Sequence, residues 1–153
     1  MSLKRRTFIT LIGGAAAARP LAARAEKNDG VRRVSVIMGF AENDEVWQAY
    51  LASFRQGLQE LGWTDGRNIR FDYRFTGDSE ERMRAMAEEV VGLKPDVILV
   101  STNSVVSATL KATRSIPIVF TWVSDPVGSG FVTNLPHPGG TGFHNFEPAI
   151  GGK

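Results

Sequence analysis

The chain has 153 residues, 42% of them hydrophobic, and contains no cysteine, which excludes a disulfide framework, a cysteine metal site and a lipid-modified cysteine anchor. Its formal net charge of +2 is uneven, because residues 1–25 hold five basic residues and no acidic one, leaving 13 basic and 16 acidic residues after them and a net charge of −3. No basic cluster interleaved with aromatic residues remains in that part, so we expect no nucleic-acid partner.

The first 25 residues have the pattern of an export signal. Lys4-Arg5-Arg6-Thr7-Phe8-Ile9 precedes a short, weakly apolar run, and Ala23-Arg24-Ala25 resembles a small-residue cleavage site. The paired arginines resemble a twin-arginine signal, with a Sec signal as the alternative. The apolar run is too short to cross a hydrocarbon core, which needs about 20 residues. We therefore predict a soluble periplasmic protein, with residues 26–32 as a polar linker.

After the linker, short apolar runs alternate with segments of helical period. A β-branched strand is predicted at Val34–Met38, and the caps offered by Glu42-Asn43-Asp44 begin a helix that ends near Gly62. The apolar positions of this helix recur at three- and four-residue steps and predict a single apolar stripe: Trp47, Tyr50, Leu51, Phe54, Leu58 and Leu61.

The second half of the pattern repeats this alternation. Residues 69–75 alternate between apolar and charged side chains, which predicts a half-buried strand near a sheet edge. Asp78 with Glu81 predicts a capping box for the next helix. Apolar runs at Val97–Val100 and Ile116–Phe120 predict central strands, joined by a helix from about Ser104 to Thr113. The fold class is therefore α/β: a Rossmann-like parallel sheet flanked by helices, in one domain.

Polar residues follow three of the predicted strands, at the end where parallel α/β sheets bind ligands. The candidate ligand-binding residues are Phe40, Asn43, Ser101, Thr102, Asn103, Ser104, Trp122, Ser124 and Asp125. Hydroxyl groups, backbone N–H groups and a helix N-terminus suit a carboxylate or another small polar solute, and the two aromatic residues suit an apolar face. The alternatives are that the polar residues only cap helices and that the aromatic residues are core.

Enzyme chemistry has little support in the sequence. The turn at residues 38–44 lacks the glycines of a dinucleotide or P-loop site, and its two carboxylates would repel a pyrophosphate. Neither histidine, His137 or His144, has a recognisable catalytic partner, and Ser124 beside Asp125 lacks a base. We expect no enzyme activity, no cofactor and no metal.

Several segments in order resemble a known family. They are Arg33-Val34-Ser35-Val36, the helix end Gln56 to Trp63, Gly66-Arg67-Asn68-Ile69, Lys94-Pro95-Asp96-Val97-Ile98, Ile116 to Phe120, Ser124 to Gly128, Pro138 to Phe143, and Gly151-Gly152-Lys153. Together they are similar to ABC-transporter substrate-binding proteins of the tryptophan/tyrosine-binding type. The resemblance covers residues 33 to 153.

The resemblance implies a type I periplasmic binding protein, in which two α/β lobes close on a small solute and pass it to an ABC permease. Residues 33–138 would be the N-terminal lobe, and residues 139–153 the hinge and the start of a second lobe that this chain lacks. We expect a truncated form, monomeric when full length; a partner chain supplying the second half is the alternative. The family implies an amino acid-like solute, aromatic by first choice.

Two other functions remain open at this stage. An exported sensory or interaction module would use the same lobe to dock on a membrane receptor. An exported hydrolase would need a nucleophile and base that the sequence does not offer.

Overall fold

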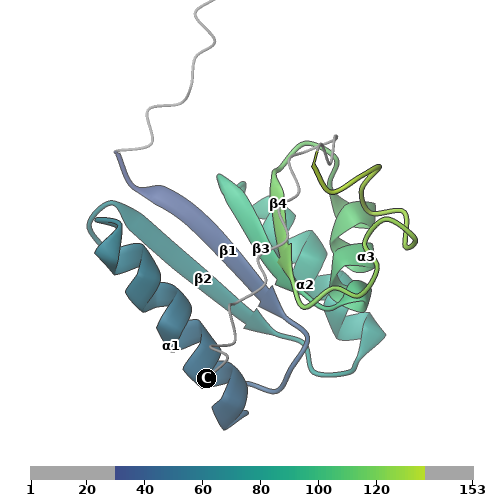
Figure 1. Ribbon diagram of the computed structural model, residues 1–153, viewed down its shortest axis with the longest axis horizontal. Helices are drawn as coiled ribbons and strands as arrows, with labels where there is room; N and C mark the ends of the chain where they lie inside the picture. The colour runs from purple at the N-terminus through teal and green to yellow at the C-terminus, as the bar shows by residue number, and fades with distance from the viewer. Residues whose placement is uncertain (1–29, 137–153) are drawn as a thin grey trace, which may run out of the picture.

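The chain folds as a parallel α/β sheet, seen in a computed structural model that describes residues 30–136 (Figure 1). The elements are β1 (Arg32–Met38), α1 (Glu45–Glu60), β2 (Ile69–Phe75), α2 (Glu80–Gly92), β3 (Val97–Ser101), α3 (Asn103–Ala112) and β4 (Ile118–Thr121). The predicted fold class and the predicted order of elements are confirmed. β1 begins inside the predicted linker, at Arg32, because its backbone already pairs with β2 there. No helix within residues 30–136 has the length and apolarity that crossing a membrane requires.

The strands lie in the order β2-β1-β3-β4, and all three pairings are parallel. β3 is central, and its Ile98 and Val100 have no exposed surface, as its continuous apolar run predicts. The prediction that the fourth strand is also central is wrong for the described residues, where β4 is an edge of the sheet. Its burial alternates, because Val119 faces a side of the sheet that is incompletely covered.

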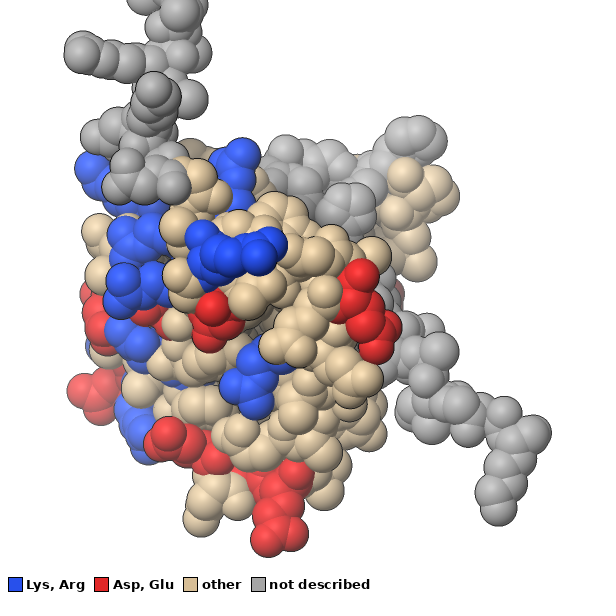
Figure 2. All heavy atoms as spheres, turned by 90° about the vertical axis from the view of Figure 1, so that its left-hand side faces the viewer, with Lys and Arg blue, Asp and Glu red and all other residues tan. Residues whose placement is uncertain are grey.

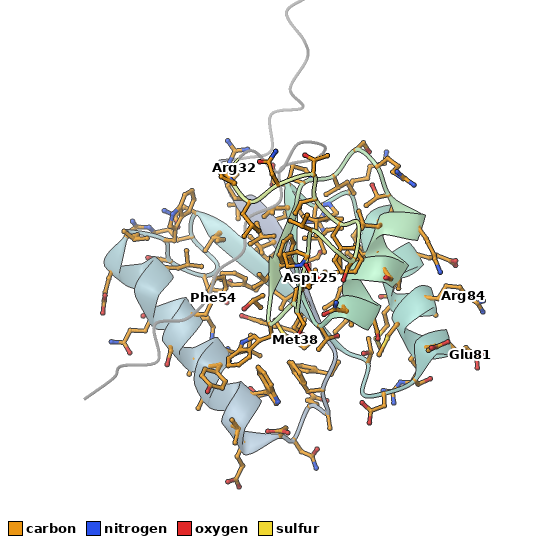
Figure 3. The ribbon with its side chains drawn as sticks, turned by 45° about the vertical axis from the view of Figure 1, so that its right-hand side comes forward. Arg32, Met38, Phe54, Glu81, Arg84 and Asp125 are labelled. Carbon is orange, nitrogen blue, oxygen red and sulfur yellow. The ribbon has the colours of Figure 1, made fainter. Side chains whose placement is uncertain are left out.

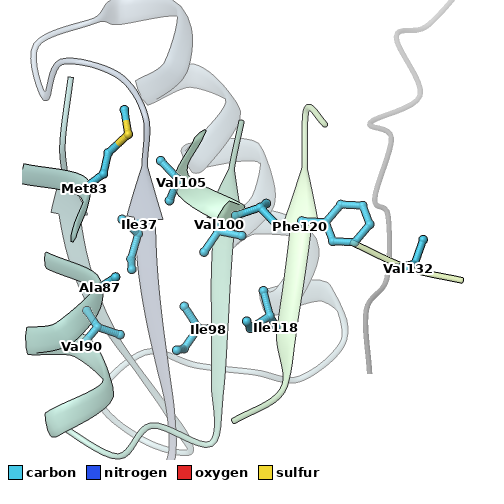
Figure 4. Packing of buried hydrophobic residues seen from close by; sticks show 11 residues of the cluster. Ile37, Met83, Ala87, Val90, Ile98, Val100, Val105, Ile118, Phe120 and Val132 are labelled. Atoms are coloured by element: carbon cyan, nitrogen blue, oxygen red, sulfur yellow. The ribbon is translucent and has the colours of Figure 1, made fainter. Parts of the chain in front are cut away.

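Figure 1 shows α1 on one side of the four strands and α2 with α3 on the other. The side of α2 and α3 holds the larger core cluster (Figure 4). There Ile37 from β1, Ile118 and Phe120 from β4, and Val90 from α2 are almost wholly buried. Two helices over three neighbouring strands thus complete this face of the sheet.

Both ends of α1 have the caps that the sequence predicts. The side chain of Asp44 accepts hydrogen bonds from the backbone N–H groups of Val46 and Trp47. At the other end Gly62 has φ of 87°, and its N–H donates to the carbonyl of Gln59 at 2.9 Å, while that of Trp63 donates to Leu58 at 2.9 Å. This left-handed cap closes the helix with the two hydrogen bonds of a Schellman motif.

The apolar stripe of α1, by contrast, is only partly buried. Leu51 is 5% exposed, but Leu61 is 77% exposed. Between this stripe and the sheet lies a cavity of about 430 Å³, which we call the apolar groove. Its lining comes from α1 (Trp47, Tyr50, Leu51, Ser53, Phe54, Gly57, Leu58), from Leu61, and from the sheet and its edge (Met38, Leu99, Val119, Thr121, Trp122). The predicted single stripe therefore lies on one side of α1, but part of it stays uncovered because α1 alone does not cover this face.

β2 forms the opposite edge of the sheet, as its alternating pattern predicts. Its aromatic residues face α1, where Phe71 and Phe54 pack edge to face at 6.1 Å. Its charged residues lie on the other face, where Arg74 donates to Glu89 of α2 at 2.7 Å. Figure 2 shows basic and acidic side chains interspersed on the side of the molecule formed by α1 and β2. Such charges on an edge strand disfavour pairing with another chain.

The cap of α2 differs from the predicted one. Ser79, not Asp78, precedes the first helical residue, and its hydroxyl accepts a hydrogen bond from the N–H of Arg82 at 3.3 Å. Both residues are good N-caps, so the spacing to Glu81 alone could not distinguish them.

This difference can be tested by two neighbouring alanine substitutions. Ser79→Ala removes the acceptor for the N–H of Arg82 and should lower the free energy of unfolding by about 1 kcal/mol. Asp78→Ala, at an exposed residue outside the helix, is the matched control and should change it by less than about 0.5 kcal/mol. Urea unfolding followed by circular dichroism measures both. Equal losses would show that Asp78 shares the cap.

Candidate ligand site at the carboxyl edge of the sheet

The carboxyl ends of β1, β3 and β4 lie side by side, and we call the edge that they form the carboxyl edge. The N–H of Gly39, after β1, donates to the hydroxyl of Ser101 at the end of β3 at 3.0 Å. The N–H of Thr102 donates to the carbonyl of Thr121 at the end of β4 at 3.3 Å. The three predicted polar turns, after β1, β3 and β4, thus meet, and we call them the corners. β1 and β3 are also where the strand order reverses, which is the usual ligand crevice of open α/β sheets.

Three of the predicted side chains build this edge. Ser101 is fully buried. The Asn103 amide accepts from the N–H of Ser124 at 3.0 Å and donates to the carbonyl of Ser124 at 2.9 Å, so it fastens the corner after β4 to the start of α3. Asp125 accepts from the N–H of Gly128 at 2.8 Å within its own turn. For these residues, holding the loops in place is the role that their contacts support.

The other predicted residues lie at the surface of the carboxyl edge. Asn43, Ser104 and Ser124 are exposed, while Thr102 and Phe40 are half-buried. Figure 3 labels Asp125 in the loop after β4 and Met38 at the end of β1, which mark two of the corners. Polar groups able to meet a solute therefore remain on the corners after β1, β3 and β4.

An aromatic cluster adjoins these polar groups. Phe40 stacks on Trp47 with ring centroids 3.6 Å apart and an interplanar angle of 2°. Trp122, which is 38% exposed, packs edge to face on Trp47 at 5.0 Å and tilted on Tyr50 at 5.2 Å. Trp47 and Tyr50 were not predicted site residues, because their spacing matches the core stripe of α1. The signal that could have found them is their place in the first two turns of a helix that starts at the carboxyl edge.

The backbone at this edge adopts conformations that favour glycine. Thr102 has φ of 68° and ψ of 151°, a region that is essentially restricted to glycine, and Trp122 and Asp125 have φ of 58° and 44°. Such backbone costs of order 1–3 kcal/mol at each residue and clusters at ligand sites. These residues follow β3 and β4 at the ends that face the candidate site. Their positions favour a functional explanation for the strain.

The N-terminus of α3 also distinguishes this edge. Asp44 caps α1 and Ser79 caps α2, but Thr102 makes no side-chain hydrogen bond to the first turn of α3. The capping alternative raised by the sequence therefore does not account for Thr102 or Asn103. A helix N-terminus without a side-chain cap suits an anion such as a carboxylate.

No candidate metal site is found in the described part of the chain. Residues 30–136 hold no group of three or more His, Asp or Glu side chains placed to bind a metal. Tyr73 and Arg74 have raised pKa values, the first through burial and the second through its hydrogen bond to Glu89. Both lie on β2, an edge strand, and pair with Val36 and Ile37 of β1. His137 and His144 lie outside the described residues.

Comparison with known proteins places the chain in a family. Residues 34–149 match the family model of the ABC transporter substrate binding protein. The chain belongs to the ABC transporter substrate-binding protein family. A tyrosine-binding protein of Clostridioides difficile (strain R20291) is 34% identical to this chain over 87 residues. These residues are 57% of this chain and 25% of that protein.

Solved structures share the fold of this chain. A conserved domain protein from Vibrio cholerae O1 biovar El Tor is 31% identical with a TM-score of 0.68, over 74% of this chain and 38% of that one. A Streptococcus pneumoniae domain solved in complex with L-Trp has a TM-score of 0.67 over 74% of this chain and 37% of that one. At 18% identity the latter supports the fold alone. The match spans well under half the length of each relative.

The close approach of two corners gives a testable prediction. A Cβ added at Gly39 would lie 2.7 Å from Oγ1 and 3.1 Å from Cγ2 of Thr102. Gly39→Ala should therefore lower the free energy of unfolding by about 1–3 kcal/mol. Adding Thr102→Ala removes both atoms and should restore part of that loss, as a double-mutant cycle by urea unfolding would measure. Strictly additive effects would contradict the contact between the two corners.

Proposed function

We propose that this chain is the N-terminal lobe of the extracytoplasmic solute-binding component of an ABC transporter. In this proposal residues 33–138 form the lobe, and residues 139–153 are the hinge and the start of a second lobe. The observation that carries the proposal is the meeting of the β1, β3 and β4 corners at the carboxyl edge of a substrate-binding family member. The family favours binding without turnover, and so does the lack of a recognised nucleophile and base among the candidate residues of the edge.

The chemistry of the edge favours an amino acid-like solute with an aromatic side chain. The uncapped N-terminus of α3 suits a carboxylate, with the exposed hydroxyl groups of Ser104 and Ser124 beside it. Trp122, Tyr50 and the Phe40–Trp47 stack offer aromatic surface for the side chain. The tyrosine-binding relative at 34% identity supports the same class of solute.

The rest of the transport cycle follows from the family. A second lobe would close on the solute and an ABC permease would receive it, with the full-length protein a monomer. Residues 1–25, outside the described part of the chain, would be removed after twin-arginine export to the periplasm. The chain spans 25% of the tyrosine-binding protein and 38% of the Vibrio cholerae protein, which supports the view that it corresponds to one lobe of a longer receptor.

Ligand binding to this lobe can be measured as a thermal shift. If a complete receptor binds at about −8 kcal/mol, one wall of the site retains about −4 kcal/mol, a millimolar affinity. Phenylalanine at 10 mM should then stabilise the chain by about 1.4 kcal/mol and raise Tm by about 5 °C. Phenethylamine, which lacks the carboxylate, should give no shift. A flat response to aromatic amino acids at this concentration would count against the proposal.

Two substitutions after β4 separate binding from general stability. Trp122→Ala removes an exposed ring of the aromatic cluster and should abolish the phenylalanine shift. Val127→Ala, at a 43% exposed residue of the following turn, is the control and should preserve it. A phenylalanine shift that persists in Trp122→Ala would show that the solute does not bind at the aromatic cluster.

The export route is tested in the leader. Replacing Arg5 and Arg6 together by lysine keeps the positive charge but removes both guanidinium groups. A twin-arginine signal read by its receptor should then fail, and the precursor should accumulate in the cytoplasm in a cell fractionation assay. Undiminished export of the double variant would indicate a Sec signal.

A further inference from the structure

The side-chain amide of Asn103 has both of its N–H donors engaged by one loop. Asn103 is the first residue of α3, and its Nδ2 donates to the carbonyl of Ser124 at 2.9 Å and to the hydroxyl of Ser129 at 3.1 Å. Its Oδ1 accepts from the N–H of Ser124 at 3.0 Å. An asparagine amide has only two N–H donors, and both are used here. Asn103 therefore lies at the candidate site without a donor to offer a solute.

The loop after β4 has strained backbone. Ser124 lies between Trp122, with φ of 58°, and Asp125, with φ of 44°, and positive φ values favour glycine. Backbone of this kind persists only where the surrounding structure determines it. Farther along, the loop is anchored in the protein interior, because Pro126 and Val132 are buried. The strained segment before that anchor is the part that the hydrogen bonds from α3 hold.

Two consecutive residues at the start of α3 tie the chain on both sides of Trp122. The N–H of Thr102 donates to the carbonyl of Thr121 at 3.3 Å, and the Asn103 amide bonds both backbone groups of Ser124. Between these two ties, the ring of Trp122 packs into the aromatic cluster. The backbone of Trp122 therefore cannot swing its ring away from the cluster unless one of the ties breaks.

We infer that Asn103 is a positioning residue of the candidate site, which fixes the distance between the N-terminus of α3 and the ring of Trp122. The inference rests on the proposed function, in which the helix N-terminus binds the carboxylate of the solute and the aromatic cluster meets its ring. Because one residue holds both parts of the site, they behave as a rigid unit. Such a unit selects solutes by the number of bonds between carboxylate and ring. Asn103 thus determines specificity without contacting the solute.

The indole signals of the ¹⁵N-labelled chain test the positioning role without any solute. The chain has three tryptophans, Trp47, Trp63 and Trp122, and each gives its own indole N–H signal. In Asn103→Ala the signals of Trp47 and Trp122 should shift or broaden, because the bonds that hold the loop are lost. The signal of Trp63, which follows the other end of α1, should not change. An unchanged Trp122 signal in the folded variant would overturn the inference.

Two further variants separate positioning from general stability. Ser79→Ala removes the cap of α2 and should lower the free energy of unfolding without moving the Trp122 signal. Ser129→Ala removes one acceptor of the Asn103 amide and should move the Trp122 signal in the same direction as Asn103→Ala, by a smaller amount. If Asn103→Ala does not fold, Ser129→Ala decides alone, and an unchanged Trp122 signal in that variant would contradict the inference.

Two carboxylic acids that differ by one methylene group test the role in specificity. 3-Phenylpropionate has the carboxylate-to-ring spacing of phenylalanine, and 4-phenylbutyrate is one methylene longer. In an NMR titration the wild-type chain should bind the longer acid about tenfold more weakly, because a rigid site does not accommodate the extra methylene. In Asn103→Ala the two affinities should approach each other, whereas Ser79→Ala should keep the wild-type ratio. A wild-type ratio in Asn103→Ala would overturn the role in specificity.

The proposed function and the inference fail in different ways. If neither acid binds the wild-type chain, and phenylalanine does not bind it either, the proposed function fails. The indole signals, measured without solute, still decide whether Asn103 positions Trp122. If the solutes bind but the indole signals of Asn103→Ala match those of the wild-type chain, the proposed function stands and the inference is wrong.

Discussion

The parallel pairing of β3 with both β1 and β4 is the constraint on which the candidate site depends. The carboxyl ends of adjacent parallel strands must lie at one edge, so three loops distant in sequence become neighbours. β3 holds this arrangement because Ile98 and Val100 are fully buried in the larger core cluster. The hydrogen bonds from Gly39 to Ser101 and from Thr102 to Thr121 then tie the corners to one another.

The carboxyl edge exposes polar groups, and its backbone is less stable locally than it could be. Thr102, Trp122 and Asp125 have positive φ values, and α3 starts without a side-chain cap. Each feature costs free energy that the buried core elsewhere offsets, and a fold under selection for stability alone would place glycine and a capping residue there. In a substrate-binding family, a helix N-terminus without a side-chain cap at this edge is a reason to retain this arrangement.

Much of the fold could be predicted because it depends on local pattern. The period of α1, its Asp44 cap and its Gly62 terminus depend only on residues that are close in the sequence. What depends on distant contacts could not be predicted. Ser101 belongs to the predicted cluster, but only its burial beneath Gly39 shows that it supports the edge. Trp47 and Tyr50 have the spacing of core residues, and only the position of Trp122 reveals the aromatic cluster. The bare face beside α1 follows from strand order, which periodicity does not encode.

An NMR titration of the ¹⁵N-labelled chain with phenylalanine tests the central claim most directly. We expect the carboxylate to bind the N-terminus of α3 and the side chain to contact the aromatic cluster. The signals of the backbone amides of Asn103, Ser104 and Val105 and of the indole N–H of Trp122 should then shift together. All four should give the same dissociation constant, in the millimolar range. The chemical shifts of amides at the opposite end of the strands, such as that of Lys94, should not change. Shifts confined to that opposite end, or absent from the first turn of α3, would contradict a solute site at the carboxyl edge.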